Sequence, residues 1–222
     1  MKVWLAAVVG TKNGAKRTRG AKDAKAAMTA EERRISIINT TTQFVAQHGF
    51  WGLRLREIAV AEDMTEAGLL YHFGSKEGLL LAVLDYRDKT DRAALYGRLN
   101  VPLPAGGEAI GDDDDFPVGL RDLTIATTER NAGQPEIVRL YTVLEGEALS
   151  QNHPAYEYFR NREQWVMREY TRAALNDGAA DPERTARQTL AAMDGLQMRW
   201  LYDPESIDLA DEWKLLVDKI LR

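Results

Sequence analysis

The chain has 222 residues and no cysteine, and 45% of its residues are hydrophobic. That apolar content is enough to build a core, and the absence of cysteine excludes disulfides and thiolate metal sites. The net charge of −5 argues against a protein that coats nucleic acid generally. No run of about 18 apolar residues is present, so we expect no membrane span. The lack of cysteine fits a cytoplasmic protein.

The charge is distributed unevenly along the chain. Residues 1–90 hold 14 Lys or Arg and 10 Asp or Glu, a net charge of +4, whereas residues 91–222 have a net charge of −9. Contacts with phosphate depend on the local field and not on the net charge of the whole protein. The first part of the chain is therefore the candidate for binding DNA.

Residues 1–28 form the first predicted segment, a disordered basic arm. Six Lys or Arg lie within residues 10–28, among many Gly and Ala. Two interpretations stay open: a solvated tail, which we favour, or an arm that contacts phosphates or a minor groove. The apolar stretch at residues 3–9 is short and has no convincing cleavage site, so we do not expect export.

The first helix is predicted to begin after Thr29. Thr29 and Glu32 have the spacing of a capping box, in which each side chain accepts a hydrogen bond from the other residue's amide. Gly49 is predicted to end this helix, as a C-terminal glycine does. The apolar stripe expected on its buried face consists of Ile35, Ile38, Thr42, Val45 and Ala46.

Helical spacing of apolar residues continues through the rest of the chain. No segment has the period-2 alternation of a strand, so the predicted fold class is all-α. A Gly- and Pro-rich loop is expected over 100–117. The further helices are expected over 54–61, 65–72, 75 to the upper 90s, 118–131, 135–150, 154–177, 182–202 and 206–221.

Residues 54–73 have the pattern of a helix-turn-helix, in which two short helices cross steeply around a tight turn. The turn is predicted at residues 63–65, with Thr65 as the N-cap of the second helix. The side chains expected to lock the crossing are Leu55, Ile58, Ala59, Leu69 and Phe73.

This stretch resembles the TetR family of transcriptional regulators. The resemblance is carried by residues 49–52 (Gly-Phe-Trp-Gly), 55–59 (Leu-Arg-Glu-Ile-Ala) and 67–80, which begin Ala-Gly-Leu-Leu-Tyr-His-Phe-Gly-Ser-Lys. It implies a helix-turn-helix DNA-binding domain over 29–74 and a larger helical effector-binding and dimerisation domain over 75–222. It also implies a homodimeric repressor that a small-molecule effector releases from double-stranded operator DNA.

The resemblance implies a set of DNA contacts. It places His72 and Lys76 at the phosphate backbone, although His72 and Tyr71 could also be structural. The full set is Arg54, Arg56, Thr65, Glu66, Gly68, Tyr71, His72 and Lys76.

Several residues depart from the usual pattern of the family, namely Arg54, Glu62, Asp63, Glu66 and Leu70. A carboxylate beside DNA can accept a hydrogen bond from cytosine N4 or point to solvent. We favour solvent for Glu62 and Asp63, and both interpretations stay open for Glu66.

The second domain is expected to hold the effector and the dimer interface. An apolar pocket with a few polar groups suits a small-molecule ligand, and we expect Tyr141, Glu145, Trp165 and Met193 near it. The last two helices are expected to form the dimer surface through Leu190, Leu196, Trp200, Trp213, Leu216 and Ile220.

No catalytic motif is present in residues 91–222, and none of the three histidines has the spacing of a metal site. The run Asp112–Asp115 is interpreted as a solvated acidic loop. We therefore expect no enzyme activity, no metal and no cofactor. The alternatives are a helical DNA-binding protein without effector control and, less favoured, a small-molecule-binding protein or enzyme.

Overall fold

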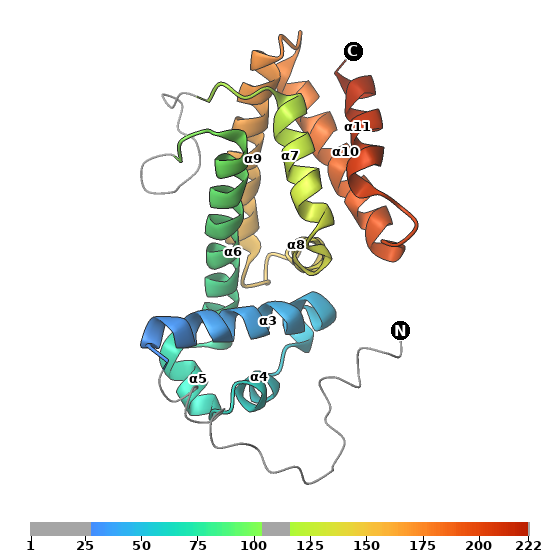
Figure 1. The fold of residues 1–222 in the computed structure, drawn as a ribbon. Coiled ribbons are helices and arrows are strands. Elements are labelled where there is room, and N and C mark those ends of the chain that lie inside the picture. Colours follow the sequence, from blue (N-terminus) through green and yellow to red (C-terminus); the bar gives the residue numbers. More distant parts are fainter. Residues whose placement is uncertain (1–27, 104–115, 222) are drawn as a thin grey trace. The chain divides into compact units, whose positions relative to one another are not determined.

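A computed structural model describes residues 28–103 and 116–221 of the chain. Every regular element in these two ranges is a helix, which confirms the predicted all-α fold class (Figure 1). None of these helices is long and apolar enough to cross a membrane. The predicted basic arm, apart from Met28, lies outside the described residues, as do Asp112–Asp115 and most of the predicted loop over 100–117.

The chain divides into two compact units, Met1–Ile35 and Ser36–Arg222. In the first unit, Thr29 precedes α3 (Ala30–Gly52). The Glu32 amide donates to the Thr29 hydroxyl at 3.2 Å, and the Glu32 carboxylate accepts from the Thr29 amide at 2.8 Å. This is the predicted capping box. The hydrogen bonds from Thr29 also lower the pKa of Glu32, because they stabilise the ionised carboxylate.

Helix α3 does not end at Gly49 as predicted but continues to Gly52. Gly49 nevertheless interrupts the helical geometry, with φ 67° and ψ −178°, in a region of backbone conformation that essentially only glycine adopts. The predicted residue is therefore the site of a kink, after which one further helical turn follows.

A carboxylate from a distant part of the chain occupies the space beside Gly49. A Cβ atom at Gly49 would lie 2.1 Å from Oε1 of Glu147. Glu147 is the last residue of α8 (Pro135–Glu147), and its Oε2 accepts a hydrogen bond from the Phe50 amide at 2.7 Å. Glycine at position 49 thus gives the carboxylate room to reach the backbone.

His153 completes this contact from the loop after α8. Its Nε2 lies 3.4 Å from Oε2 of Glu147, and its ring packs edge-on against Phe50 and Trp51, with centroids 5.3 and 5.7 Å apart. Burial lowers the pKa of His153, against the opposing effect of Glu147. A neutral imidazole therefore fits here, and its Nδ1 accepts from the Ala155 amide at 3.2 Å.

The helices α4 (Leu55–Ala61), α5 (Glu66–Phe73) and α6 (Lys76–Leu99) follow α3. They share one buried core with α3, from Ile37 to Phe50, and with parts of α8 and α9 (Tyr156–Asn176). Helix α6 also reaches a second core, because Leu80 and Leu84 belong to the first and Tyr96 to the second (Figure 1). One continuous helix thus joins the two cores.

The second core is formed with α7 (Leu120–Ala132), α9, α10 (Pro182–Tyr202) and α11 (Leu209–Ile220). The bounds of α7–α11 differ from the prediction by at most three residues. Pro135 and Pro182 each begin a helix. Proline suits this position because the first amides of a helix have no hydrogen-bond partner within it. Asp181 and Asp208 cap α10 and α11 by accepting from amides three residues on, at 3.2 and 3.0 Å.

The space at Gly49 generates a stability prediction. We expect Gly49→Ala to lower the free energy of unfolding by about 1–3 kcal/mol, because the backbone conformation is strained for alanine and the new methyl group displaces Glu147. Thermal or urea unfolding measures this change. Gly146→Ala is the matched control, since a Cβ there meets nothing within 4 Å and helical alanine is favoured over glycine. An equal loss of stability in both variants would contradict this interpretation.

Candidate nucleic-acid interface and internal cavity

The helix-turn-helix is built as the sequence predicts. Ile58 and Ala59 of α4 and Leu69 of α5 are buried between the helices. The Thr65 hydroxyl caps α5 by accepting from the Gly68 amide at 3.0 Å, and Asp63 turns the chain with φ 55°. These contacts fix the position of α5, so its outer face is presented on a rigid support.

Glu62 does not point to solvent, and that prediction is wrong. Glu62 is 3% exposed. Its carboxylate accepts hydrogen bonds from Ser36 Oγ at 2.9 Å and from Thr40 Oγ1 at 2.5 Å. A buried carboxylate needs such partners, and these two hydroxyls lie on α3. Glu62 therefore ties the end of α4 to α3, and it contributes no negative charge to an outer face. Asp63 is exposed, as expected.

The eight residues predicted to contact DNA fall into two groups by exposure. Arg54, Arg56, Thr65, Glu66 and Tyr71 are exposed, and Tyr71 keeps 88% of its surface. Gly68, His72 and Lys76 are partly buried.

Lys76 is the first residue of α6, which Ser75 caps by accepting from the Gly78 amide at 2.9 Å. Its Nζ lies 4.4 Å from the centre of the Phe50 ring, which places the ammonium group by a cation–π contact. A helix N-terminus and a lysine together favour an anion such as phosphate. His72 lies in the last turn of α5, with its ring packed against Tyr71 and Phe73.

A cavity of about 160 Å³ lies among α6, α7, α8, α9 and α10. Tyr141, Glu145, Trp165 and Met193, which the sequence placed near a ligand pocket, all line it. Its apolar wall includes Leu95, Leu123, Ile137, Val138 and Leu190. The cavity has the mixed apolar and polar lining of small-molecule sites.

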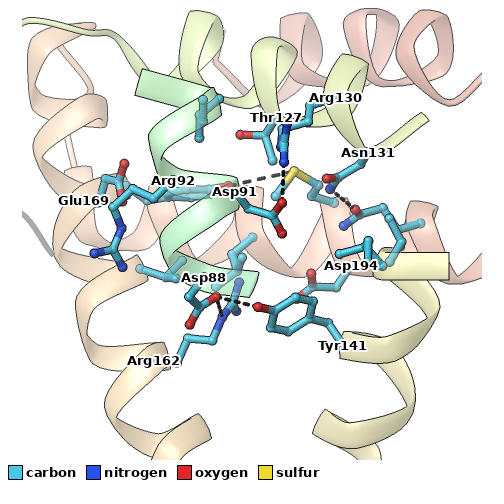
Figure 2. A pocket seen from close by; sticks show the side chains of 18 of the residues that line it. Asp88, Asp91, Arg92, Thr127, Arg130, Asn131, Tyr141, Arg162, Glu169 and Asp194 are labelled. Atoms are coloured by element: carbon cyan, nitrogen blue, oxygen red, sulfur yellow. Dashed lines mark hydrogen bonds and ion pairs between the residues drawn. The ribbon is translucent and has the colours of Figure 1, made fainter. Parts of the chain in front are cut away.

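Charged residues from α6 form the polar side of the cavity (Figure 2). Asp88 accepts from the Tyr141 hydroxyl at 2.7 Å and from the Tyr158 hydroxyl, and lies 3.4 Å from Arg162 Nε. Asp91 accepts from Arg130 and, at 3.2 Å, from Arg87. Arg162 also reaches Glu145 at 3.3 Å. The guanidinium groups of Arg130 and Arg162 are thus paired with carboxylates of the protein.

Three further carboxylates line the cavity with fewer partners. Burial raises the pKa of Glu169 to about 7, although Arg92 and the hydrogen bond from Tyr96 oppose this effect. Loss of solvation raises the pKa of Asp194 to about 7, and the neighbouring Glu145 adds to the rise. Burial is also the main cause of a raised pKa at Glu145. The raised pKa values show that burial in this cavity disfavours the negatively charged form of each carboxyl group.

Sequence reasoning missed Asp88, Asp91, Arg92, Arg130 and Arg162. A signal for the first three does exist. Asp88, Asp91 and Arg92 follow Leu84 at spacings of four, seven and eight residues, so they continue the buried face of α6. Charged residues on a buried helical face indicate a polar site inside the protein.

The residues predicted to form a dimer surface are placed differently from one another. Trp200 and Trp213 are 3% and 0% exposed within the single chain, so they are core residues and offer no surface to a partner. Leu190, Leu196, Leu216 and Ile220 are partly buried. The exposed stripe of α10 includes Ala191, Asp194, Gly195, Met198 and Tyr202.

Within residues 28–103 and 116–221, no group of three or more His, Asp or Glu side chains could hold a metal ion.

Comparison with known proteins agrees with this geometry. Residues 37–83 match the family model described as bacterial regulatory proteins, tetR family. No curated protein matches the sequence significantly.

Several solved structures share the fold. A TetR-family transcriptional regulator from Streptomyces coelicolor is 20% identical, with a TM-score of 0.67 over 86% of this chain and 95% of its own. One from Rhodococcus sp. is 23% identical, with a TM-score of 0.62 over 86% and 100%. A transcriptional regulator from Saccharomonospora viridis, solved in complex with choline, is 18% identical, with a TM-score of 0.64 over 86% and 96%.

The matched segment spans α4 and α5, together with most of α3 and the start of α6. The helical remainder corresponds to the rest of the fold in these regulators. Residues 37–83 thus match the tetR family model, and the chain shares the fold of solved transcriptional regulators of that family.

Proposed function

We propose that the protein is a transcriptional repressor that binds operator DNA as a homodimer and is released by a small-molecule effector. The observation that carries this proposal is the presence, in one chain, of a helix-turn-helix with an exposed outer face and a lined internal cavity. A DNA-binding protein without effector control has no need of such a cavity. The cavity therefore favours the effector-controlled function over that alternative.

We propose that the outer face of α5 enters the major groove. Glu66 and Tyr71 are exposed there, and a recognition helix contacts base edges with such residues. Arg54, Arg56, His72 and Lys76 would contact phosphates on either side, which positions the protein but does not read the sequence.

The dimer is proposed to form through α10 and α11. Ala191, Gly195, Met198 and Tyr202 are exposed and spaced four, three and four residues apart, which places them on one face of α10. Small residues at two of these positions let another helix approach closely. Leu215 of α11 is 63% exposed. A two-fold axis through this surface would present two recognition helices to a near-palindromic site.

The cavity is the proposed effector site. Tyr141, Glu145, Trp165 and Met193 line it, and the structural neighbour in complex with choline supports the binding of a small organic molecule by this fold.

Helix α8 would transmit the effect of a ligand. Tyr141 and Glu145 line the cavity, and Glu147, half a turn further on, holds the Phe50 amide at 2.7 Å. A ligand that shifts α8 therefore moves the carboxylate on which the end of α3 rests. Release from DNA requires that the ligand prefer the shifted state.

The function is tested by a mobility-shift assay with the DNA upstream of the protein's own gene and of the neighbouring genes. We expect a specific complex that unlabelled fragment competes away and unrelated DNA does not. Failure to form a specific complex with any of these fragments would contradict the proposed function.

The phosphate contacts generate a second prediction. We expect Lys76→Ala to weaken binding to specific and unrelated DNA alike, and to reduce the slope of log affinity against log salt by about 0.9 per protomer. His72→Ala should weaken both kinds of DNA binding as well. Fluorescence anisotropy at several salt concentrations measures these effects.

Lys89→Ala is the matched control, because Lys89 is exposed on α6 and pairs with Asp85 at 3.0 Å. Like Lys76→Ala, it removes one positive charge, but at a position outside the proposed interface. The slope of log affinity against log salt should therefore equal that of the wild type. A slope that is unchanged in Lys76→Ala, or reduced equally in the control, would refute the phosphate role of Lys76.

The proposed dimer surface generates a third prediction. In sedimentation equilibrium we expect the wild type at about twice the chain mass of 24.9 kDa, and Gly195→Glu and Met198→Glu close to the monomer, because each places a charge at the centre of the stripe. Leu149→Glu is the control, since Leu149 is 84% exposed after α8. Dimers that persist in both α10 variants would rule out this surface.

A further inference from the structure

The carboxylates in the cavity outnumber its cationic groups. Five carboxylates line it, and three guanidinium groups do so. Arg130 is paired with Asp91, and Arg162 is shared between Asp88 and Glu145. An anionic ligand would have to compete with these carboxylates for Arg130 and Arg162. The charge balance thus disfavours an anion.

Asp194 is the carboxylate with the least compensation. It makes no hydrogen bond or ion pair with the described residues, whereas Glu169 accepts from the Tyr96 hydroxyl at 3.2 Å. Asp194 lines the cavity from α10. A ligand group in the cavity there meets a carboxylate that has no hydrogen bond or ion pair with the described residues.

Glu145 shares this shortage of positive charge. Among the described residues it forms an ion pair with Arg162 alone, at 3.3 Å, and the same guanidinium lies 3.4 Å from Asp88. Burial is the main cause of the raised pKa at both Glu145 and Asp194, and Glu163 raises the pKa of both as well. Repulsion between like charges in one site is reduced when a proton or a cation binds there.

The aromatic residues of the cavity already accept cations. Arg92 lies 4.2 Å from the centre of the Trp165 ring, and Arg162 lies 4.7 Å from that of Tyr141. These aromatic rings therefore give the cavity an electron-rich wall. Leu95, Leu123 and Val138 form an apolar wall.

We propose that the effector is an organic cation, an amine or ammonium group on an apolar or aromatic body, and that Glu145 and Asp194 hold its charge. This inference rests on the proposed function only in that the cavity is the effector site. The apolar wall contacts the apolar or aromatic part of the ligand. The two carboxylates compensate for the hydration that the ammonium group loses on binding.

The test compares three probes of similar shape that differ in one group: 2-phenylethylamine, 2-phenylethanol and 3-phenylpropionate. Dissociation constants are measured by isothermal titration calorimetry on the full-length protein without DNA. We expect the amine to bind at least about tenfold more tightly than the alcohol, and the carboxylate to bind most weakly.

Variants of the two carboxylates assign the preference to the proposed residues. We expect Glu145→Gln and Asp194→Asn to reduce the preference for the amine to about threefold or less, while thermal unfolding shows that both remain folded. Glu157→Gln is the matched control, because Glu157 is 70% exposed on α9 and does not line the cavity. It should leave the preference unchanged.

The pH dependence is a further arm of the test. The groups that act on Asp194 are Glu145 of α8 and Arg162 and Glu163 of α9. Because the pKa of Asp194 is about 7, its carboxylate gains charge as the pH rises from 6 to 8. We expect the amine to bind about tenfold more tightly at pH 8 than at pH 6, the alcohol to show little change, and Asp194→Asn to remove the difference.

The proposal is overturned if the alcohol or the carboxylate binds as tightly as the amine, if none of the three binds, or if the preference survives in both variants. Because no DNA is present, these outcomes leave DNA binding by residues 37–83 intact. Conversely, a protein that binds the amine selectively but forms no specific DNA complex would contradict the proposed function and retain the cation site.

Discussion

The hydrogen bond from the Phe50 amide to Glu147 is the contact on which the arrangement of this protein depends. It joins the end of α3, within the matched DNA-binding segment, to the end of α8, which lines the cavity. Three features make it possible: the absence of a side chain at Gly49, the kink there, and the buried ring of His153 beside the carboxylate. A charged acceptor on a backbone amide is stronger than a neutral one, so the two elements are held in a defined register.

A second constraint acts on the cavity itself. Its carboxylates and guanidiniums come from five helices, and most are committed to one another, as Asp91 is to Arg130. Such a network specifies one packing of these helices only while its members are satisfied. Glu145 and Asp194 are the incomplete part of it. A ligand that completes the network would favour a particular position of α8, and the contact between Glu147 and Phe50 would carry that preference to α3.

Local patterns in the sequence were sufficient for most of the fold. Capping residues such as Thr29 and Thr65, together with apolar spacing, predicted where helices begin, because caps act within a few residues. They were not sufficient where a distant group decides. Glu62 was expected in solvent because its partners, Ser36 and Thr40, are far away in sequence.

The polar side of the cavity was missed for the same reason, since Asp88 resembles a solvated helical residue until Tyr141 and Tyr158 are placed beside it. Trp200 and Trp213 were assigned to an interface, but a single chain already buries them.

The central claim is that the DNA-binding segment and the cavity are linked through α8. The most direct test is hydrogen–deuterium exchange of the full-length protein with and without its DNA fragment. The link predicts that DNA alters exchange both within residues 37–83 and in α8, and that Glu147→Gln removes the change in α8. An effect of DNA that is confined to residues 37–83 in the wild type would contradict the link.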